Sequence, residues 1–136
     1  MSTFVKISEG VSLAMHSMLL MALNENGILT TKDIAKKLDA SATHLAKVIQ
    51  RLNNANLVES TRGPKGGSRL ARPKEDITLL EIFEAIEGKY YSPKCLLNET
   101  LCEEKCCLMG ELIGKTNEQI AYELATRTLA DVAKNS

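Results

Sequence analysis

Aromatic residues are scarce in this sequence, and tryptophan is absent. Aromatics make up 4% of the 136 residues, whereas hydrophobic residues together reach 44%. Aliphatic and methionine side chains must therefore fill the core, which favours helices over a β-sandwich. At this length we expect one domain, or one domain with an extension, because domains most often run about 100–150 residues.

The sequence also lacks a long hydrophobic run. The longest unbroken one, Met18 to Leu23, is far shorter than the roughly 20 residues of a membrane-spanning helix. The N-terminus has neither the basic stretch nor the small-residue cleavage site of a signal peptide. We therefore expect a cytoplasmic protein without a membrane partner. Thiols stay reduced in that compartment, so the four Cys indicate metal binding or redox sensing before structural disulfides.

Net charge is zero, but the charges are unevenly distributed. Residues 31–74 carry ten Lys or Arg and three acidic residues, whereas residues 75–136 carry twelve acidic residues and six basic ones. A basic block inside a neutral chain is typical of a local anionic partner such as nucleic acid. A solvated helical face would give the same pattern.

Hydrophobic periodicity predicts three helices in the first part of the chain. The first runs from Ser8 to Leu23 and stops at Asn26-Gly27. The second begins at Thr30 or Thr31 and breaks near Asp39-Ala40. The third begins at Ser41, a good N-cap, and buries a stripe at helical spacing. That stripe is Leu45, Val48, Ile49 and Leu52.

The period then changes to that of a β-hairpin. Leu57-Val58 opens one strand, Ser68 to Arg72 forms the other, and the glycine-rich turn between them spans residues 62–67. A further helix follows, with Thr78 and Glu81 as a capping box and Gly88 as its stop. The expected fold is mainly α with a small β-hairpin wing.

Two short helices joined by a four-residue corner are typical of a helix-turn-helix, and the hairpin would be its wing. The second of these helices offers polar groups near its start and cations further along, as a major groove requires. Ser41 could instead serve only as the helix cap, and His44 could be a surface residue. The predicted DNA-binding residues are Ser41, Thr43, His44, Lys47, Arg51, Arg62, Pro64, Lys65 and Arg69.

The glycine-rich basic loop has a second interpretation as a nucleotide-phosphate loop. It lacks the Gly-Lys-Ser/Thr sequence of a P-loop, and a strand follows it where that motif needs a helix. The wing interpretation is therefore favoured. In it, Arg62 enters the minor groove or pairs with a base, and Lys65 contacts phosphate.

Several stretches resemble, in order, the IscR/NsrR/CymR family of bacterial winged-helix transcription regulators, and the match covers essentially the whole chain. The wing sequence Arg-Gly-Pro-x-Gly-Gly is the most specific of them. The resemblance implies a homodimer that binds a palindromic DNA operator through the wing and the third helix. Ser68 departs from it, because an aromatic residue usually follows these glycines. The matching stretches are Asp33-Ile34-Ala35, Leu45 to Leu52, Leu57-Val58, Arg62-Gly63-Pro64 with Gly66-Gly67, and Ile77 to Ile86.

All four cysteines, Cys95, Cys102, Cys106 and Cys107, lie within thirteen residues. The spacing is C-x6-C-x4-C with Cys107, or C-x6-C-x3-C with Cys106. Neither gives the paired knuckles of a structural zinc site, so zinc is disfavoured. Three spread thiolates suit an iron–sulfur cluster, [2Fe–2S] or [4Fe–4S].

The family resemblance agrees, because its cluster-binding members carry three Cys in this loop. It implies Cys95, Cys102 and Cys107 as the metal ligands, with Cys106 as a spare or resolving thiol. The fourth ligand stays open. Members that use a histidine have it where this chain has Gly110, and others use a carboxylate near the N-terminus. The candidates are Glu9, Cys106, Ser12 and an external thiol, with Glu9 and Cys106 ranked first.

The C-terminal stretch shows a further apolar stripe, Ile120, Leu124, Leu129 and Val132, which predicts one helix. Pairing with its counterpart in a second chain would cover this stripe, although packing onto its own domain would do so too. The predicted organisation is a winged helix-turn-helix over residues 1–88, a cysteine-bearing sensor loop over 89–110 and a dimerisation helix over 111–136.

These observations predict a DNA-binding regulator, with repression favoured, whose operator binding is controlled by an iron–sulfur cluster. The signal would be nitric oxide, redox state or iron–sulfur supply. One alternative is a cluster-free regulator of sulfur metabolism that responds through thiols or a partner protein. A redox or electron-transfer protein is disfavoured, because the sequence shows neither a C-x-x-C pair nor catalytic acids. We expect no enzymatic activity and no small-molecule substrate.

Overall fold

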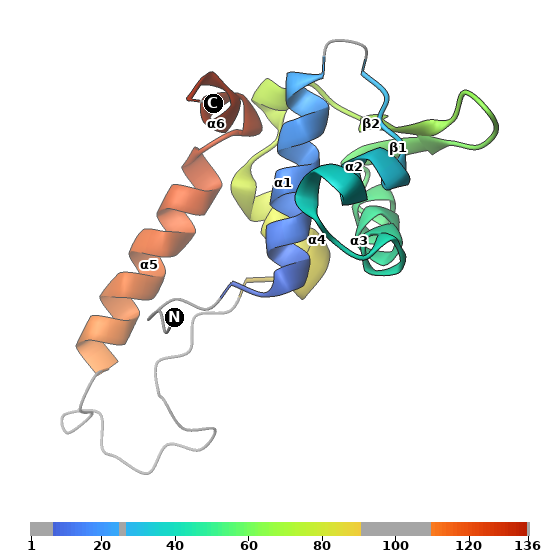
Figure 1. Ribbon diagram of the computed structural model, residues 1–136. Coiled ribbons are helices and arrows are strands. Elements are labelled where there is room, and N and C mark those ends of the chain that lie inside the picture. The colour runs from blue at the N-terminus through green and yellow to red at the C-terminus, as the bar shows by residue number, and fades with distance from the viewer. Residues whose placement is uncertain (1–6, 25–26, 91–109, 136) are drawn as a thin grey trace.

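The computed structural model describes residues 7–24, 27–90 and 110–135. It is mostly helical with one two-stranded sheet (Figure 1). None of the described helices is both long and apolar enough to cross a membrane. The elements are α1 (Glu9–Leu23), α2 (Thr31–Leu38), α3 (Ala42–Asn54), β1 (Val58–Thr61), β2 (Gly67–Leu70), the 3₁₀ helix η1 (Lys74–Asp76), α4 (Leu79–Glu87), α5 (Gly110–Thr126) and α6 (Leu129–Lys134).

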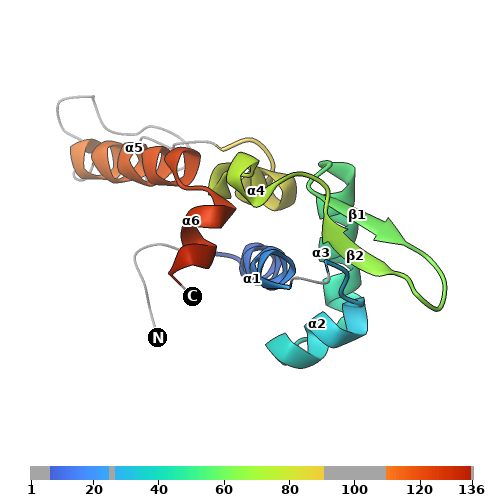
Figure 2. The ribbon, with the colours of Figure 1, turned by 90° about the horizontal axis from the view of Figure 1, so that it is seen from above.

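Helix α1 is the centre of the molecule. Figure 2 looks nearly along it and shows α2 and α3 on one side, α4 above and α6 on the other side. Its residues Val11, Ala14 and Met18 are fully buried. They belong to a continuous core with apolar residues of α2, α3, α4 and α6. The aliphatic core that the scarcity of aromatics predicts is therefore present.

Short polar residues begin the helices where the sequence predicts. Ser8 and Ser41 cap α1 and α3, and Thr30 and Thr78 form capping boxes with Asp33 and Glu81. These caps satisfy backbone N–H groups that have no partner within a helix. Asp39 ends α2 in the left-handed conformation with φ 51°. The corner between α2 and α3 is thus fixed locally.

The hairpin pairs β1 with β2 in antiparallel register from Val58 opposite Leu70 to Thr61 opposite Gly67. Its base is joined to the chain before α2 by two backbone hydrogen bonds between Leu29 and Ser68, of 2.9 and 2.7 Å. Gly67 is required there, since a Cβ would lie 2.6 Å from Ile28 Cγ2 and 2.7 Å from the Leu29 carbonyl oxygen. The wing is therefore docked at its base and projects at its tip (Figure 1).

The prediction of one helix over 111–136 is wrong, because the chain breaks between α5 and α6. Thr128 caps α6 with Asp131 in a capping box, and Leu129 is buried in the molecule's own core. Two backbone hydrogen bonds hold this break against the start of α4, Leu129 N to Ile77 O at 2.8 Å and Leu79 N to Arg127 O at 3.0 Å. The second half of the apolar stripe thus packs onto its own domain.

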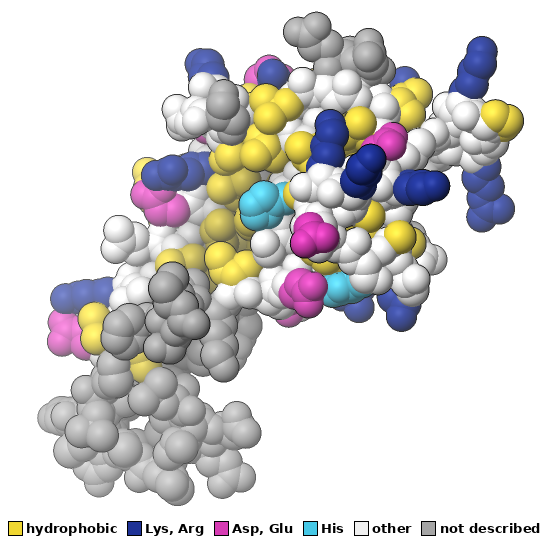
Figure 3. Space-filling model, in the orientation of Figure 1, with side chains coloured by type: hydrophobic (Ala, Val, Ile, Leu, Met, Phe, Trp, Pro, Cys, Tyr) yellow, Lys and Arg dark blue, Asp and Glu magenta, His cyan; other side chains and the backbone are white. Residues whose placement is uncertain are grey.

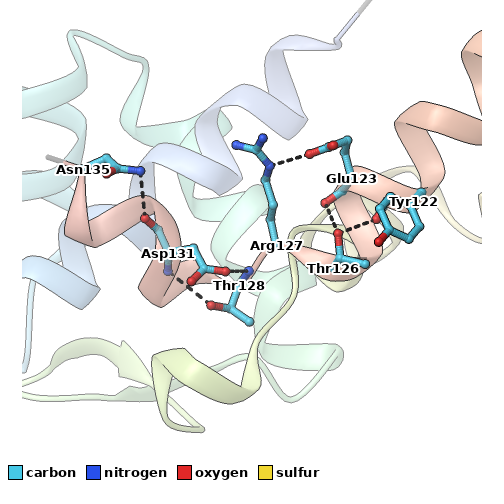
Figure 4. Close-up of polar contacts among 7 residues, drawn as sticks. All are labelled: Tyr122, Glu123, Thr126, Arg127, Thr128, Asp131 and Asn135. Atoms are coloured by element: carbon cyan, nitrogen blue, oxygen red, sulfur yellow. Dashed lines mark hydrogen bonds and ion pairs between the residues drawn. The ribbon is translucent and has the colours of Figure 1, made fainter.

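Polar contacts stiffen the same break (Figure 4). Arg127 Nε lies 2.6 Å from Glu123 Oε2, and Asn135 donates to the Asp131 carbonyl oxygen. A backbone and a side-chain hydrogen bond from Thr128 hold the pKa of Asp131 below its usual value. An open depression lies here, lined by Arg127, Asp131, Val132 and Asn135. Its cation, Arg127, is already paired with Glu123.

Candidate DNA-binding surface and the cysteine segment

Helix α3 presents one apolar and one polar face. Its buried residues, Leu45, Val48, Ile49 and Leu52, are the predicted stripe. Burial of that stripe orients the helix and leaves Thr43 and Lys47 exposed on the other side. Neither side chain has a hydrogen-bond or ion-pair partner among the described residues. These two residues are free to meet a ligand.

Ser41 serves as the N-cap of α3. Its Oγ accepts a hydrogen bond from the His44 backbone N–H at 3.3 Å, so the capping role that the sequence left open is present. The cap engages one lone pair of the hydroxyl, and the residue is exposed. Contact between Ser41 and DNA stays a prediction.

Two other predicted residues of α3 have partners inside the protein. His44 Nδ1 lies 3.8 Å from Glu9 Oε1 of α1. Arg51 Nη1 donates to the carbonyl oxygen of Ile86, in the last turn of α4, at 2.9 Å. Both contacts join α3 to another helix, and neither could be deduced from sequence spacing. For His44, contact with DNA stays a prediction.

The wing tip presents Arg62, Pro64 and Lys65 to solvent. The turn is compact, with a Gly66 N to Gly63 O hydrogen bond of 2.9 Å. A Cβ at Gly66 would collide with the Thr61 carbonyl oxygen. The side chains of Arg62 and Lys65 have no partner within the described part of the chain. Figure 3 shows Lys and Arg side chains on the wing and the neighbouring helices, which agrees with the basic block in the sequence.

Arg69 lies on β2 and pairs across the hairpin with Glu59 of β1. Its Nη2 is 3.3 Å from Glu59 Oε2, and both side chains are more than half exposed. Such exposed pairs contribute at most about 1 kcal/mol. The pair therefore does not prevent Arg69 from turning toward a phosphate group.

A hydrogen-bond chain at the base of the wing was not predicted from the sequence. Asn53 Nδ2 of α3 donates to Ser60 Oγ at 2.9 Å, and Ser60 Oγ lies 2.9 Å from Ser68 Oγ. Ser68 is 3% exposed. The available signal was that two serines face each other in the β1–β2 register. This chain ties the end of α3 to both strands of the wing.

The cysteine segment, residues 91–109 of the predicted sensor loop, lies outside the described residues. Cys95, Cys102, Cys106 and Cys107, the predicted ligand set and spare thiol, all lie outside the described residues. Among the described residues, no three His, Cys, Asp or Glu side chains are close enough to hold a metal ion. Glu9, a candidate fourth ligand, is described. Its side chain lies at the start of α1 and is 77% exposed.

The residues just before the cysteine segment are anchored. Tyr90 N donates to Glu84 Oε2 of α4 at 3.2 Å, and Tyr90 Oη donates to the Asn117 carbonyl oxygen of α5 at 3.0 Å. The Tyr90 ring meets the Phe83 ring edge-on, with centroids 5.9 Å apart. Burial raises the pKa of the Tyr90 phenol, so the donating O–H form is kept. The chain therefore enters the cysteine segment from a fixed position between α4 and α5.

Comparison with known proteins gives consistent results. A family model, Rrf2, described as an iron-dependent transcriptional regulator, matches residues 7–135. Among curated proteins, the chain is 31% identical over 131 residues to YwgB of Bacillus subtilis strain 168, a putative HTH-type transcriptional regulator, covering 94% of this chain and 84% of that one. It is 29% identical to the HTH-type transcriptional regulator NsrR of the same strain, covering 96% and 92%.

Among solved structures, the chain is similar to CymR, the global cysteine regulator of B. subtilis. The TM-score is 0.81 at 28% sequence identity, and the match covers 98% of this chain and 99% of that one. The arrangement of helices and wing described above is therefore that of a known winged-helix regulator.

Proposed function

This chain belongs to the Rrf2 family of transcriptional regulators, and from that premise we propose that it is a homodimeric repressor that binds a palindromic DNA operator. The main support for the proposed DNA-binding surface is a set of exposed cations on two adjacent elements, α3 and the wing. Lys47 of α3 and Arg62 and Lys65 of the wing have no partner among the described residues. In winged helix-turn-helix proteins the second helix enters the major groove.

The proposal gives the two elements different tasks. The start of α3, with Ser41, Thr43 and His44, reads base edges, since short polar groups there can reach them. Lys47 and Arg69 contact phosphate. Arg62 enters the minor groove beside Pro64, and Lys65 contacts phosphate from the wing tip.

The role of Lys65 is tested by the salt dependence of operator binding. Each phosphate contact contributes about 0.9 to the slope of log affinity against log salt concentration, because counterions are released from DNA. We expect Lys65→Ala to weaken binding to all sequences alike and to lower this slope by about one unit. Fluorescence anisotropy between about 50 and 200 mM salt measures it.

The matched control is Lys134→Ala on α6, an exposed lysine at the opposite side of the molecule from the wing (Figure 1). It removes the same charge and should leave the slope unchanged. An unchanged slope for Lys65→Ala as well would remove Lys65 from the interface.

We further propose that the cysteine segment holds an iron–sulfur cluster through Cys95, Cys102 and Cys107. Three thiolates fit such a cluster by donor chemistry, because Cys sulfur ligates its irons. The bound cluster would supply reactivity toward nitric oxide, oxygen or peroxide, and its presence would control operator binding. The fourth ligand is proposed to be Glu9 or Cys106.

The first experiment is purification without oxygen, followed by the visible spectrum and assays of iron and acid-labile sulfide. Iron with matching sulfide is expected. The adjacent cysteines offer matched variants: Cys107→Ser should lose the iron, whereas Cys106→Ser should keep most of it. Equal loss in both variants would assign Cys106, not Glu9, as the fourth ligand. Loss of iron in Cys106→Ser but not in Cys107→Ser would contradict this ligand set.

A second candidate function is favoured by the likeness to CymR, described as a global cysteine regulator. In it, the chain has no cluster and responds to sulfur metabolism through its thiols or a partner protein. The three-cysteine pattern argues against this candidate. An iron-free protein that cannot be reconstituted would exclude the cluster and favour thiol or zinc sensing, and the proposed DNA binding would still stand.

A further inference from the structure

The start of α1 and the residue Arg51 of α3 meet the C-terminal end of α4. We name this contact region the α4 junction; its residues are Ser8, Gly10, Arg51, Ile86 and Glu87. Arg51 of α3 donates to the Ile86 carbonyl oxygen at 2.9 Å. Ser8, the N-cap of α1, donates from Oγ to Glu87 Oε1. Helix α4 ends at Glu87, and its C-cap is Gly88 with φ 85°.

The hydrogen bond from Arg51 satisfies a group that α4 cannot satisfy itself. The last four carbonyls of a helix have no donor within the helix, and Ile86 is the penultimate residue of α4. A cation there also interacts favourably with the negative end of the helix dipole. Because the donor is charged, the bond is stronger than one between neutral groups.

Close packing holds the acceptor in place from the other side. A Cβ on Gly10 of α1 would lie 3.2 Å from Ile86 Cγ2, so the two helices approach tightly at this point. The Ile86 side chain is 9% exposed. Ile86 is thus held between α1 and α3, and Arg51 has a rigid partner.

Arg51 lies one helical turn after Lys47, on the same exposed side of α3. The sequence predicts DNA binding for both residues. In the structure the two side chains differ in their contacts. Lys47 has no partner in the described parts of the chain, whereas Arg51 donates a hydrogen bond to α4.

We infer that Arg51 is a positioning residue, which fixes α3 against the end of α4, and that it is not a phosphate contact. This inference rests on the proposed operator binding. The chain after α4 leads through Tyr90 into the segment that carries the cysteines. A displacement of the α4 end would therefore pass through Arg51 to the orientation of α3 in the groove.

The test compares Arg51→Met with Lys47→Met, which removes the other cation of the same helix face. Affinity for a selected operator is measured against salt concentration. We expect Lys47→Met to lower the salt slope by about one unit. Arg51→Met should leave the salt slope unchanged and weaken binding by about tenfold at every salt concentration, because α3 would be misoriented without losing a phosphate contact. Arg51→Gln replaces Arg51→Met if that variant does not fold.

A second readout separates positioning from simple support of the fold. Operators are prepared with half-sites moved one base pair closer or further apart, because a dimer spans half-sites about one DNA turn apart. If Arg51 fixes α3, the unaltered protein should discriminate among these spacings by at least about tenfold and Arg51→Met by at most about threefold.

The outcomes are distinct. A salt slope lowered by one unit in Arg51→Met would show a phosphate contact and overturn the inference. An unchanged slope with full spacing discrimination, accompanied only by a lower unfolding midpoint, would overturn it too. If the unaltered protein binds no DNA sequence selectively, the proposed function fails instead.

Discussion

Ser68 shows how one residue can fit a family fold by a different chemistry. The family resemblance has an aromatic residue after the wing glycines, and this chain has a serine that is almost fully buried. Burial of a hydroxyl without a partner is unfavourable. The Ser60 hydroxyl offsets this cost, because its Oγ lies 2.9 Å from the Ser68 Oγ. Ser60 Oγ in turn accepts a hydrogen bond from Asn53 of α3. The departure is therefore accommodated inside the wing base.

This hydrogen-bond chain predicts unequal costs for its two serines. Ser60→Ala leaves the buried Ser68 hydroxyl without its partner, so we expect the free energy of unfolding to fall by about 1–3 kcal/mol. Ser68→Ala removes the buried polar group itself, and Ser60 keeps its bond from Asn53. Its cost should be about 1 kcal/mol or less. Urea unfolding of both variants measures the difference, and equal costs would contradict the chain.

At the scale of elements, short helices in this fold depend on their caps. Helices α2, α4 and α6 have eight, nine and six residues, and each is preceded by an N-cap Thr in a capping box. Isolated helices shorter than about 12–15 residues are marginal in water. The caps and the core together thus stabilise helices that their length alone would not.

Glu81 combines a cap with an ion pair and predicts a pH dependence. Burial raises the pKa of Glu81, but hydrogen bonds from the Thr78 backbone and from Arg72 outweigh this effect. The pKa therefore lies below 4.5, the usual value for a Glu carboxyl. A carboxyl with a lowered pKa in the folded state contributes stability above its unfolded pKa. That stability is lost as the pH falls through the folded value.

Glu81→Gln isolates this charge, because Gln can still complete a capping box. We expect the variant to be less stable than the unaltered protein at neutral pH, and the two to converge as the pH falls below about 4.5. Thermal unfolding of both proteins at about one-unit steps from roughly pH 3 to pH 7 measures this difference in stability. Glu118→Gln controls for net charge. A difference that stayed constant with pH would exclude the ionised form as its source.

The sequence predicts elements well where the signals are local. Ser8, Ser41 and Thr78 mark helix starts correctly, and Gly88 marks a stop. The C-terminal prediction is wrong because Ile120, Leu124, Leu129 and Val132 keep helical spacing across a break. The missed signal there is the Thr128–Asp131 capping pair. Contacts between distant helices, such as Arg51 with Ile86, have no local signal and could not be predicted.

At the scale of the whole molecule, the basic side chains and the apolar side chains lie on different parts of the surface. Lys and Arg gather on the helix-turn-helix and the wing, and apolar side chains form a band between α1 and the C-terminal helices (Figure 3). Helix α5 packs against α4, and α6 packs against α1. On α5, Ile120 and Leu124 stay only partly buried, and Leu112 is exposed. A second copy of the chain would cover this apolar surface.

Ile120→Glu tests this dimer prediction. A carboxylate in an apolar helix interface would lose its hydration without a partner, so we expect the variant to sediment as a monomer. Gln119→Glu adds the same charge at the neighbouring, exposed position and should remain dimeric. Because two half-sites are then no longer bound together, operator affinity of the monomer should fall by about a hundredfold or more. Circular dichroism checks that the variant is folded. A folded Ile120→Glu variant that still sediments as a dimer would place the interface away from α5.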